Sequence, residues 1–187
     1  MARTRHALLA ALPFLLATAV HAQTPPAAAS PQLSDPQVAH VAVTANSIDI
    51  DLAKFARAQS HNRAVWQFAA TMIRDHGSVN RRAAALAKKL GVTPTDNAVS
   101  QSLQTAAKAA HDSLAGLQGA AFDRAYIEHE IGYHQGVLDA IDKVLVPNTQ
   151  NAELKKLLTD VRPVVATHLA HAKQLKTRLE RSQRTTK

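Results

Sequence analysis

Three segments of the chain repeat apolar residues at alternating intervals of three and four, the spacing of one face of an α-helix. Each apolar stripe is interrupted by a histidine, His76, His134 or His168. Because such a stripe packs against partner helices, each histidine carries two ring nitrogens that need partners into an apolar core. A polar site shared by three helices is therefore expected. The stripes are Val65, Ala69, Met72, His76, Val79, Ala83, Leu86 and Leu90; Ile127, Ile131, His134, Leu138, Ile141 and Leu145; and Leu154, Leu158, Val161, Val165, His168, Ala172, Leu175 and Leu179.

Capping residues and helix breakers divide the chain into helices. They predict long helices over residues 35–58, 62–90, 121–146 and 151–181, and a shorter helix over 98–117. The links at 58–62 and 147–150 are short enough to force antiparallel neighbours, whereas about 30 residues separate the two hairpins. The pattern predicts an all-α, ferritin-like four-helix bundle of two antiparallel hairpins joined by a long crossover that contains the short helix. The first helix is expected to bury Val38, Val41, Ala45, Ile48, Leu52 and Phe55.

The three histidines should meet in one layer of such a bundle. Helices of similar length that pack antiparallel bring their midpoints to one level, and each histidine lies near the midpoint of its helix. The first helix offers Asp49 at this level, and Glu130 lies one turn before His134. Imidazoles with one or two carboxylates suit Zn, Cu, Fe or Ni. We therefore predict that a single Zn, Cu or Fe ion binds in this histidine layer, which consists of His76, His134, His168, Asp49 and Glu130.

Other interpretations of the layer stay open. Buried histidines are often satisfied by one another, by a carboxylate or by water, without any ligand. The alternative function is therefore a non-enzymatic structural or interaction module of the cell envelope, whose core histidines form a hydrogen-bonded network. A pair of irons is disfavoured because di-iron bundles use Glu-x-x-His motifs, whereas Glu130 precedes His134 by four residues. Asp75, beside His76, is expected to face solvent or neighbouring arginines. The chain has no nucleophile constellation, phosphate loop or nucleotide fingerprint, so an enzyme that uses a metal-bound water is the least favoured function, and no catalytic residue is predicted.

The N-terminus has the pattern of an export signal. Arg3 and Arg5 precede an uncharged apolar stretch, and small or β-branched residues precede a cut after Ala22. We predict a signal peptide over 1–22, a flexible linker over 23–34, the bundle over 35–181 and a frayed basic tail over 182–187. An uncut N-terminal anchor is the alternative. The predicted location is the periplasm or outer membrane of a bacterium. The chain has no cysteine, which excludes disulfides, thiolate metal sites and a lipid-modified N-terminal cysteine.

Positive charge gathers at the C-terminal end. The net charge of the chain is +8, and the residues from Lys173 onward hold six basic side chains against one acid. Such a helix end complements the helix dipole and keeps the tail solvated. The basic C-terminal segment suggests anionic components of the envelope as partners. An exported chain is not expected to bind nucleic acid. The sequence indicates no oligomeric state.

Four blocks of the sequence occur in a recognisable order: SIDIDLAKFA at 47–56, MIRDH at 72–76, FDRAY at 122–126 followed by His134, and PVVATH at 163–168. Together they resemble a known family, the bacterial domain of unknown function 4142. The resemblance covers about residues 35–179 and implies envelope export and a ferritin-like bundle. It also singles out His76, His134 and His168. Where the family commonly has Glu, this chain has the shorter acid Asp49.

Overall fold

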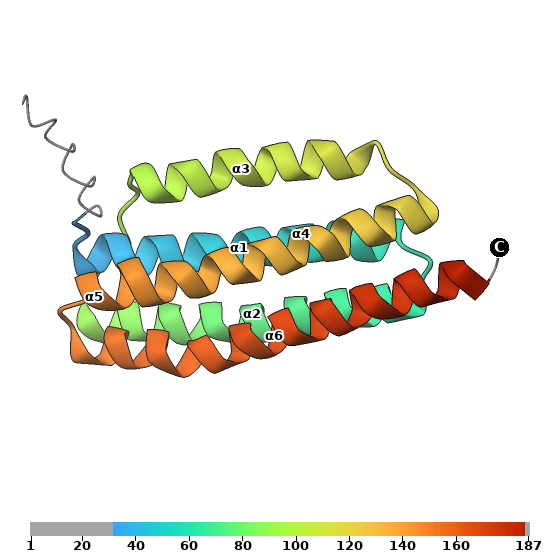
Figure 1. The fold of residues 1–187 in the computed structure, drawn as a ribbon. Coiled ribbons are helices and arrows are strands. Elements are labelled where there is room, and N and C mark those ends of the chain that lie inside the picture. Colours follow the sequence, from blue (N-terminus) through green and yellow to red (C-terminus); the bar gives the residue numbers. More distant parts are fainter. Residues whose placement is uncertain (1–31, 186–187) are drawn as a thin grey trace, which may run out of the picture.

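The computed structural model describes residues 32–185, and every regular element in this part of the chain is helical. The predicted all-α class is therefore confirmed. The predicted signal peptide and most of the linker lie outside the described residues. The elements in chain order are α1 (Asp35–Gln59), α2 (Arg63–Leu90), α3 (Ala98–Ala115), α4 (Gly119–Ala140), the π-helical turn η1 (Ile141–Leu145), α5 (Val146–Asn148) and α6 (Ala152–Thr185), as Figure 1 shows.

The helix ends follow local signals in the sequence. The side chain of Asn62 accepts the amide of Ala64 at 3.0 Å and thereby caps the start of α2. Gly91 ends α2 with a φ of 64°, a left-handed conformation that glycine adopts without a steric penalty. At the start of α1, the carboxylate of Asp35 accepts the amides of Gln150 and Asn151, both at 2.8 Å. These two hydrogen bonds fix the start of α1 to the turn that precedes α6.

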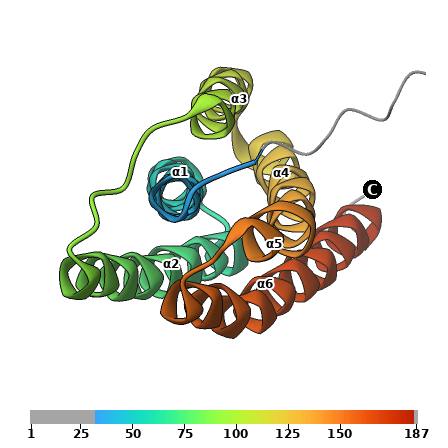
Figure 2. The same cartoon turned by 90° about the vertical axis from the view of Figure 1, so that its left-hand side faces the viewer.

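The helices form two antiparallel hairpins, α1 with α2 and α4 with α6, and α3 connects the two hairpins (Figure 1). The end view in Figure 2 shows α1, α2, α4 and α6 around a common centre, with α3 outside them. Because α3 carries the chain back along the bundle, α2 and α4 run in the same direction. This parallel pair is the ferritin-like arrangement that the long connection predicted.

The apolar core consists of two clusters. One, the aromatic end, contains Phe68, Phe122 and Tyr126 with smaller aliphatic residues, and the other, the aliphatic end, contains only aliphatic side chains. Each fully buried Leu or Phe side chain stabilises the fold by about 1.5–3 kcal/mol relative to an exposed one. The predicted stripes of α2, α4 and α6 pass from one cluster into the other. The histidines of these stripes therefore lie where the two apolar clusters meet.

The buried side of α1 differs from the predicted one. Val38, Val41 and Leu52 are buried as expected, but Ile48 is only partly buried and Asp49 is 1% exposed. The reason is that α1 packs against α2, α3 and α4, so that apolar residues are partly covered on more than one side. Asp49, which we expected beside the apolar stripe, is thus among the most deeply buried residues of the helix.

The predicted helix over 121–146 begins at Gly119 and stays regular to Ala140, after which the turn η1 is wider. Pro147 has no amide for the carbonyl one turn earlier, and its ring crowds that carbonyl, which is a physical reason for the widening. At the other end of the hairpin, α6 continues to Thr185, past the predicted end at Arg181. Within residues 32–185, no helix combines the length and the apolarity that a membrane span requires.

Candidate metal centre

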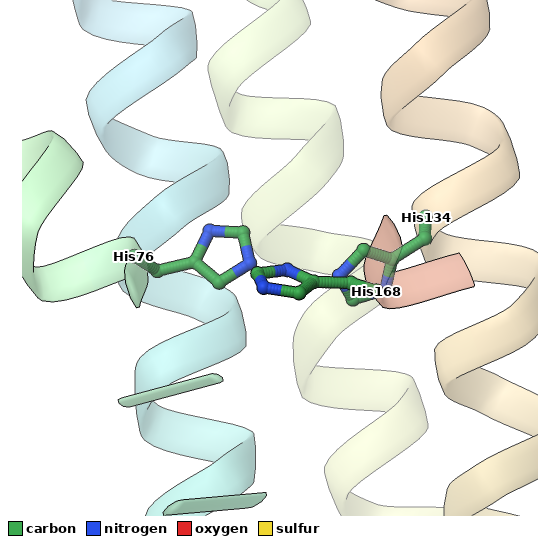
Figure 3. A group of neighbouring side chains, drawn as sticks. All are labelled: His76, His134 and His168. Atoms are coloured by element: carbon green, nitrogen blue, oxygen red, sulfur yellow. The ribbon is translucent and has the colours of Figure 1, made fainter. Parts of the chain in front are cut away.

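The structure brings the five residues of the histidine layer together. His76 comes from α2, His134 and Glu130 from α4, His168 from α6 and Asp49 from α1, and none is more than 4% exposed. The centroids of the three imidazole rings lie 5.1–5.6 Å apart. Figure 3 shows the rings converging from their helices. That these residues bind a metal ion stays a prediction.

Each imidazole is held by a hydrogen bond that points away from the other two rings. His76 Nδ1 lies 2.6 Å from Asn46 Oδ1, and the amide nitrogen of Asn46 donates to the carbonyl of Ala42 at 2.9 Å. The oxygen of Asn46 is therefore the acceptor, and His76 Nδ1 carries the proton. His134 Nδ1 donates to the backbone carbonyl of Glu130 at 2.9 Å by the same logic. The tautomers of His76 and His134 are thus set by neighbouring oxygen atoms that can only accept a hydrogen bond.

His168 is held in the same way by a carboxylate at the edge of the layer. Its Nε2 donates to Asp75 Oδ2 at 3.0 Å, and Arg74 pairs with the same carboxylate at 2.7 Å. We expected Asp75 to face solvent or neighbouring arginines, and its pair with Arg74 confirms this expectation. Its side chain is nevertheless only 24% exposed, and its contact with His168 was not expected. The reason is that α6 packs against α2 and covers the flank of α2 on which Asp75 lies.

The remaining ring nitrogens point inward and have no hydrogen-bond partner. These are His76 Nε2, His134 Nε2 and His168 Nδ1, and all three are buried. Because the opposite nitrogen of each ring holds the proton, each of these atoms presents a lone pair. One ring nitrogen from each histidine lies within 4.8 Å of the other two. Outer partners that orient the imidazoles while the inner lone pairs converge are the usual surroundings of histidine metal ligands.

The two carboxyl groups of the layer are also unpartnered. Asp49 Oδ2 lies 3.1 Å from His76 Nε2 and 3.4 Å from His134 Nε2, but neither contact has hydrogen-bond geometry. Glu130 Oε2 lies 3.4 Å from His134 Nδ1, and neither of its oxygens has a partner in hydrogen-bond geometry. The hydroxyl of Tyr126 lies near enough to lower the pKa of Glu130, against the larger effect of burial. Asp49, Glu130 and His134 form a second group whose ligand atoms lie within 4.8 Å of one another. When the two carboxyl groups are ionised, the layer gathers acceptor atoms without donors.

Burial keeps these groups uncharged near neutral pH. It raises the pKa of Asp49 to about 8 and the pKa of Glu130 well above its ordinary value. It lowers the pKa of His76 to about 3 and that of His134 to about 4, and it lowers the pKa of His168 against the opposing effect of Asp75. The charged form of each group is disfavoured because the apolar surroundings solvate it poorly. Neutral imidazoles are ready to bind a metal ion, whereas the carboxyl groups must first release protons.

The sequence interpretation missed two residues of the site. Asn46 and Asp75 orient His76 and His168, and neither was a candidate. The spacing of Asn46, three residues before Asp49 on one face of α1, is a signal that could have identified it. His171 packs on Phe68, with ring centroids 5.2 Å apart, and so lies outside the group of converging nitrogens.

Comparison with known proteins identifies a family and a shared fold. The family model described as "Domain of unknown function (DUF4142)" matches residues 20–175. Among solved structures, a DUF305 fragment from Deinococcus radiodurans matches with a TM-score of 0.66 and 18% identity over 79% of this chain and 99% of its own.

CopM in its Cu(II)-bound form matches with a TM-score of 0.59 and 21% identity over 78% of this chain and 98% of its own. Its silver-bound form matches with the same TM-score and identity, over 79% and 98%. Because the sequence identities are only 18–21%, these structural similarities establish the helical-bundle fold and nothing about function. No curated protein matches the chain.

Proposed function

The chain belongs to the DUF4142 family, and we propose that it is an exported protein of the bacterial envelope that holds one transition-metal ion in its histidine layer. His76 Nε2, His134 Nε2 and His168 Nδ1 supply nitrogen ligands, and Asp49 and Glu130 supply carboxylate oxygens. The protein stores or sequesters the ion and does not turn over a substrate. This role accounts for a polar layer that interrupts an otherwise apolar core.

The observation that carries this proposal is the convergence of three imidazole lone pairs, none of which has a hydrogen-bond partner. In a purely structural network, the inner ring nitrogens would hydrogen-bond to one another or to the carboxyl groups of Asp49 and Glu130. Here all three hydrogen bonds of the rings go outward, to Asn46, to the Glu130 carbonyl and to Asp75. A cation accepts electron pairs from all the inner atoms at once, so it satisfies the whole layer.

Copper is the ion that we favour among Zn, Cu and Fe. Imidazole nitrogens suit all three, and divalent copper binds a given nitrogen and oxygen site most tightly among the first-row ions. CopM, which has a similar fold, has been solved in copper-bound and silver-bound forms, and this agrees with the choice. A single ion fits better than paired irons because the layer has only two carboxyl groups, and neither precedes a histidine by three residues.

Metal analysis of purified residues 23–187 tests the proposal. After incubation with Cu(II), Zn(II) or Fe(II) and removal of free ions, we expect about one equivalent of bound metal. His76→Ala and His134→Ala should each abolish uptake. His171→Ala is the matched control, because this histidine is on α6 one turn after His168 but outside the layer. If the wild-type chain retains no metal and its melting temperature does not respond to any of the ions, the proposal is wrong.

Export is proposed from residues 1–22, which have the order of regions typical of a cleaved signal. Intact mass measurement of the chain from a bacterial periplasmic fraction should give a polypeptide that begins at Gln23. A chain recovered only from the cytoplasm, with Met1 retained, would contradict export.

A second role, contact with anionic envelope components, is favoured by exposed basic side chains at the end of α6. Lys173, Arg178 and Arg184 are exposed, whereas Leu175 and Leu179 of the same segment are buried in the core. Deletion of the segment would therefore disturb the bundle, and charge reversal is the better test. Replacing these three basic residues by Glu should reduce sedimentation with anionic vesicles. The same reversal at Lys54, Lys88 and Lys108 should reduce it less, and equal losses would exclude a specific basic end.

A further inference from the structure

We infer that the bundle binds a second kind of ligand, the alkyl chain of a single-chain amphiphile with an uncharged head, in a cavity at the aliphatic end. The cavity has a volume of about 390 Å³. This volume lies within the range of small-molecule sites, about 300–1,000 Å³, and exceeds the roughly 150 Å³ of an apolar cavity that takes up benzene. The inference does not depend on the proposed metal binding.

The apolar stripe of α2 is covered at one end of the bundle and partly uncovered at the other. Stripe residues that precede His76 are completely buried, namely Val65, Ala69 and Met72. Stripe residues toward the end of α2 are only partly buried and line the cavity, namely Ala83, Leu86 and Leu90. Because apolar residues at this spacing form a face that packs against a partner, the second half of α2 presents a face that residues 32–185 do not fully cover.

The cavity extends along the bundle from the histidine layer to the end at which α1 starts. Asn46, which bonds to His76, and Val79 line its inner part. Asp35 at the start of α1 and Leu90 at the end of α2 line its outer part. From Val79 to Leu90 a helix rises about 16 Å, which is the length of an extended alkyl chain of about 12 carbon atoms. The cavity therefore has the length and the volume for one such chain.

The lining selects an apolar ligand without charge. No Lys, Arg or His is among the described residues that line the cavity, and all but four of these residues are apolar. The polar ones are Asp35, Asn46, Asn80 and Asn151.

The single charged group of the lining is already engaged. The carboxylate of Asp35 accepts the amides of Gln150 and Asn151 at the N-terminal end of α1, where the helix dipole stabilises negative charge. An anionic head would therefore find no cation here, and a cationic head would compete with the bonds that hold the start of α1. An uncharged head such as a glycerol ester requires neither, while the alkyl chain gains free energy by leaving water.

A series of chain lengths tests the occupant. Metal-free residues 23–187 are titrated calorimetrically with monoacylglycerols of about 8 to about 16 carbon atoms per chain, each below the concentration at which it forms micelles. Each added methylene should strengthen binding about 4-fold up to about 12 carbon atoms, and affinity should then level off because further methylenes stay in water. Dodecanoate and dodecyltrimethylammonium, which have charged heads, should bind more weakly than the 12-carbon glycerol ester.

Two leucine substitutions on the stripe of α2 locate the ligand. Ala83→Leu fills part of the cavity, so it should weaken binding of the 12-carbon ester at least about 10-fold and leave the melting temperature unchanged or higher. Ala69→Leu adds the same atoms at a completely buried position and should lower the melting temperature by overpacking the core. Ala106→Leu on exposed α3 surface is the control for binding. Ala87→Leu, also in the lining, serves if Ala83→Leu does not fold.

Affinity that keeps rising well past about 12 carbon atoms, or that Ala83→Leu leaves unchanged, would overturn the inference, because the chains would then bind outside the cavity. Tighter binding of either charged amphiphile would overturn the uncharged head. A wild type that binds no amphiphile would overturn the inference as a whole. If sedimentation then finds a dimer that Ala83→Leu dissociates, a second copy of the chain covers the face of α2. Metal uptake is measured separately on the same preparations, so failure here leaves the proposed function standing.

Discussion

Two groups of buried polar side chains in this bundle differ in how they are satisfied. At the start of α3, the side-chain oxygen of Asn97 accepts the amides of Val99 and Ser100 at 3.1 and 3.2 Å. Its side-chain nitrogen donates to the carbonyls of Thr95 and Gln37 at 3.2 and 3.3 Å. Each polar atom of this side chain therefore has a partner, and the cluster fixes the start of the crossover helix on α1.

The histidine layer shows the opposite. Ten buried side-chain nitrogen and oxygen atoms in residues 32–185 lack a hydrogen-bond partner, and seven of them belong to the five residues of this layer. Buried polar atoms in folded proteins are nearly always paired, because an unpaired one costs about 1–3 kcal/mol. The hydrogen-bonded cluster around Asn97 has a structural role, because it caps the start of α3. The unpaired layer caps no helix end, and the ligand that we propose would account for its arrangement.

The largest expected difference between the two groups is in their response to pH. Asp49 has an ordinary pKa of 3.8 and a pKa of about 8 in the fold, so the folded chain keeps a proton that the unfolded chain releases. This contribution to stability is lost as pH rises toward 8, and Glu130 acts in the same direction. The lowered pKa values of His76, His134 and His168 act oppositely, because below pH 6.5 the unfolded chain binds protons that the folded chain excludes. The three histidines together outweigh the two protons that the buried acids keep, so stability also falls on the acid side.

The metal-free bundle should therefore be most stable at about pH 6–6.5 and melt at lower temperature on either side. As pH rises above 6.5, affinity for a divalent ion should increase while the stability of the metal-free bundle falls. The increase should be up to about 10-fold per pH unit for each proton that the ion displaces. Thermal melts and ion titrations from pH 5 to 8 measure both trends. Asp49→Asn should flatten the decline above pH 6.5. A decline that is unchanged in Asp49→Asn would mean that Asp49 is not the group responsible.

A smaller effect is the stabilisation of the fold by the ion itself. At a free ion concentration 100 times the dissociation constant, binding adds about 2.7 kcal/mol to the free energy of unfolding. For a domain of this size, the melting temperature should rise by about 5–10 °C. Calorimetry should find this increase in the wild type and in Asn97→Ala, and no increase in His134→Ala. An equal increase in His134→Ala would assign the stabilisation to ions bound elsewhere on the surface.

Local patterns in the sequence predicted the fold and the main members of the layer. The apolar stripes of α2, α4 and α6 are set by residues three and four apart, and the helix ends by Asn62 and Gly91, so no distant contact was needed to find them. The long crossover then fixed the direction of the second hairpin. Once the helices are arranged in this way, His76, His134 and His168 have to lie at one level.

The parts that the sequence did not predict depend on how each helix is rotated and covered. α3 packs on α1 and partly buries residues away from the bundle centre, so the apolar pattern of α1 did not mark the side that carries Asn46 and Asp49. Asp75 lies about 100° around α2 from His76, and only the position of α6 decides whether that flank is covered. The partners that orient the imidazoles thus follow from packing between helices, which no single stripe encodes.

The smallest expected effect comes from a matched pair of substitutions, Asn46→Ala and Asn97→Ala. Both remove a buried asparagine, at 8% and 9% exposure, whose oxygen accepts a hydrogen bond. Each should lower the free energy of unfolding by about 1–2 kcal/mol, since each leaves donors without a partner. Chemical denaturation of the metal-free proteins measures this loss, and similar values are expected for the two variants.

Metal affinity should then separate the two variants. Asn46 accepts the Nδ1 proton of His76, and without it the ring can rotate or adopt the tautomer whose inner nitrogen is protonated. Loss of such an outer partner weakens metal binding by about 10- to 100-fold, so titration should find this decrease in Asn46→Ala and unchanged affinity in Asn97→Ala. Because the two variants lose similar stability, a general weakening of the bundle would affect both affinities equally. Unchanged affinity in Asn46→Ala would show that the outward hydrogen bond of His76 does not prepare its inner nitrogen for a metal ion.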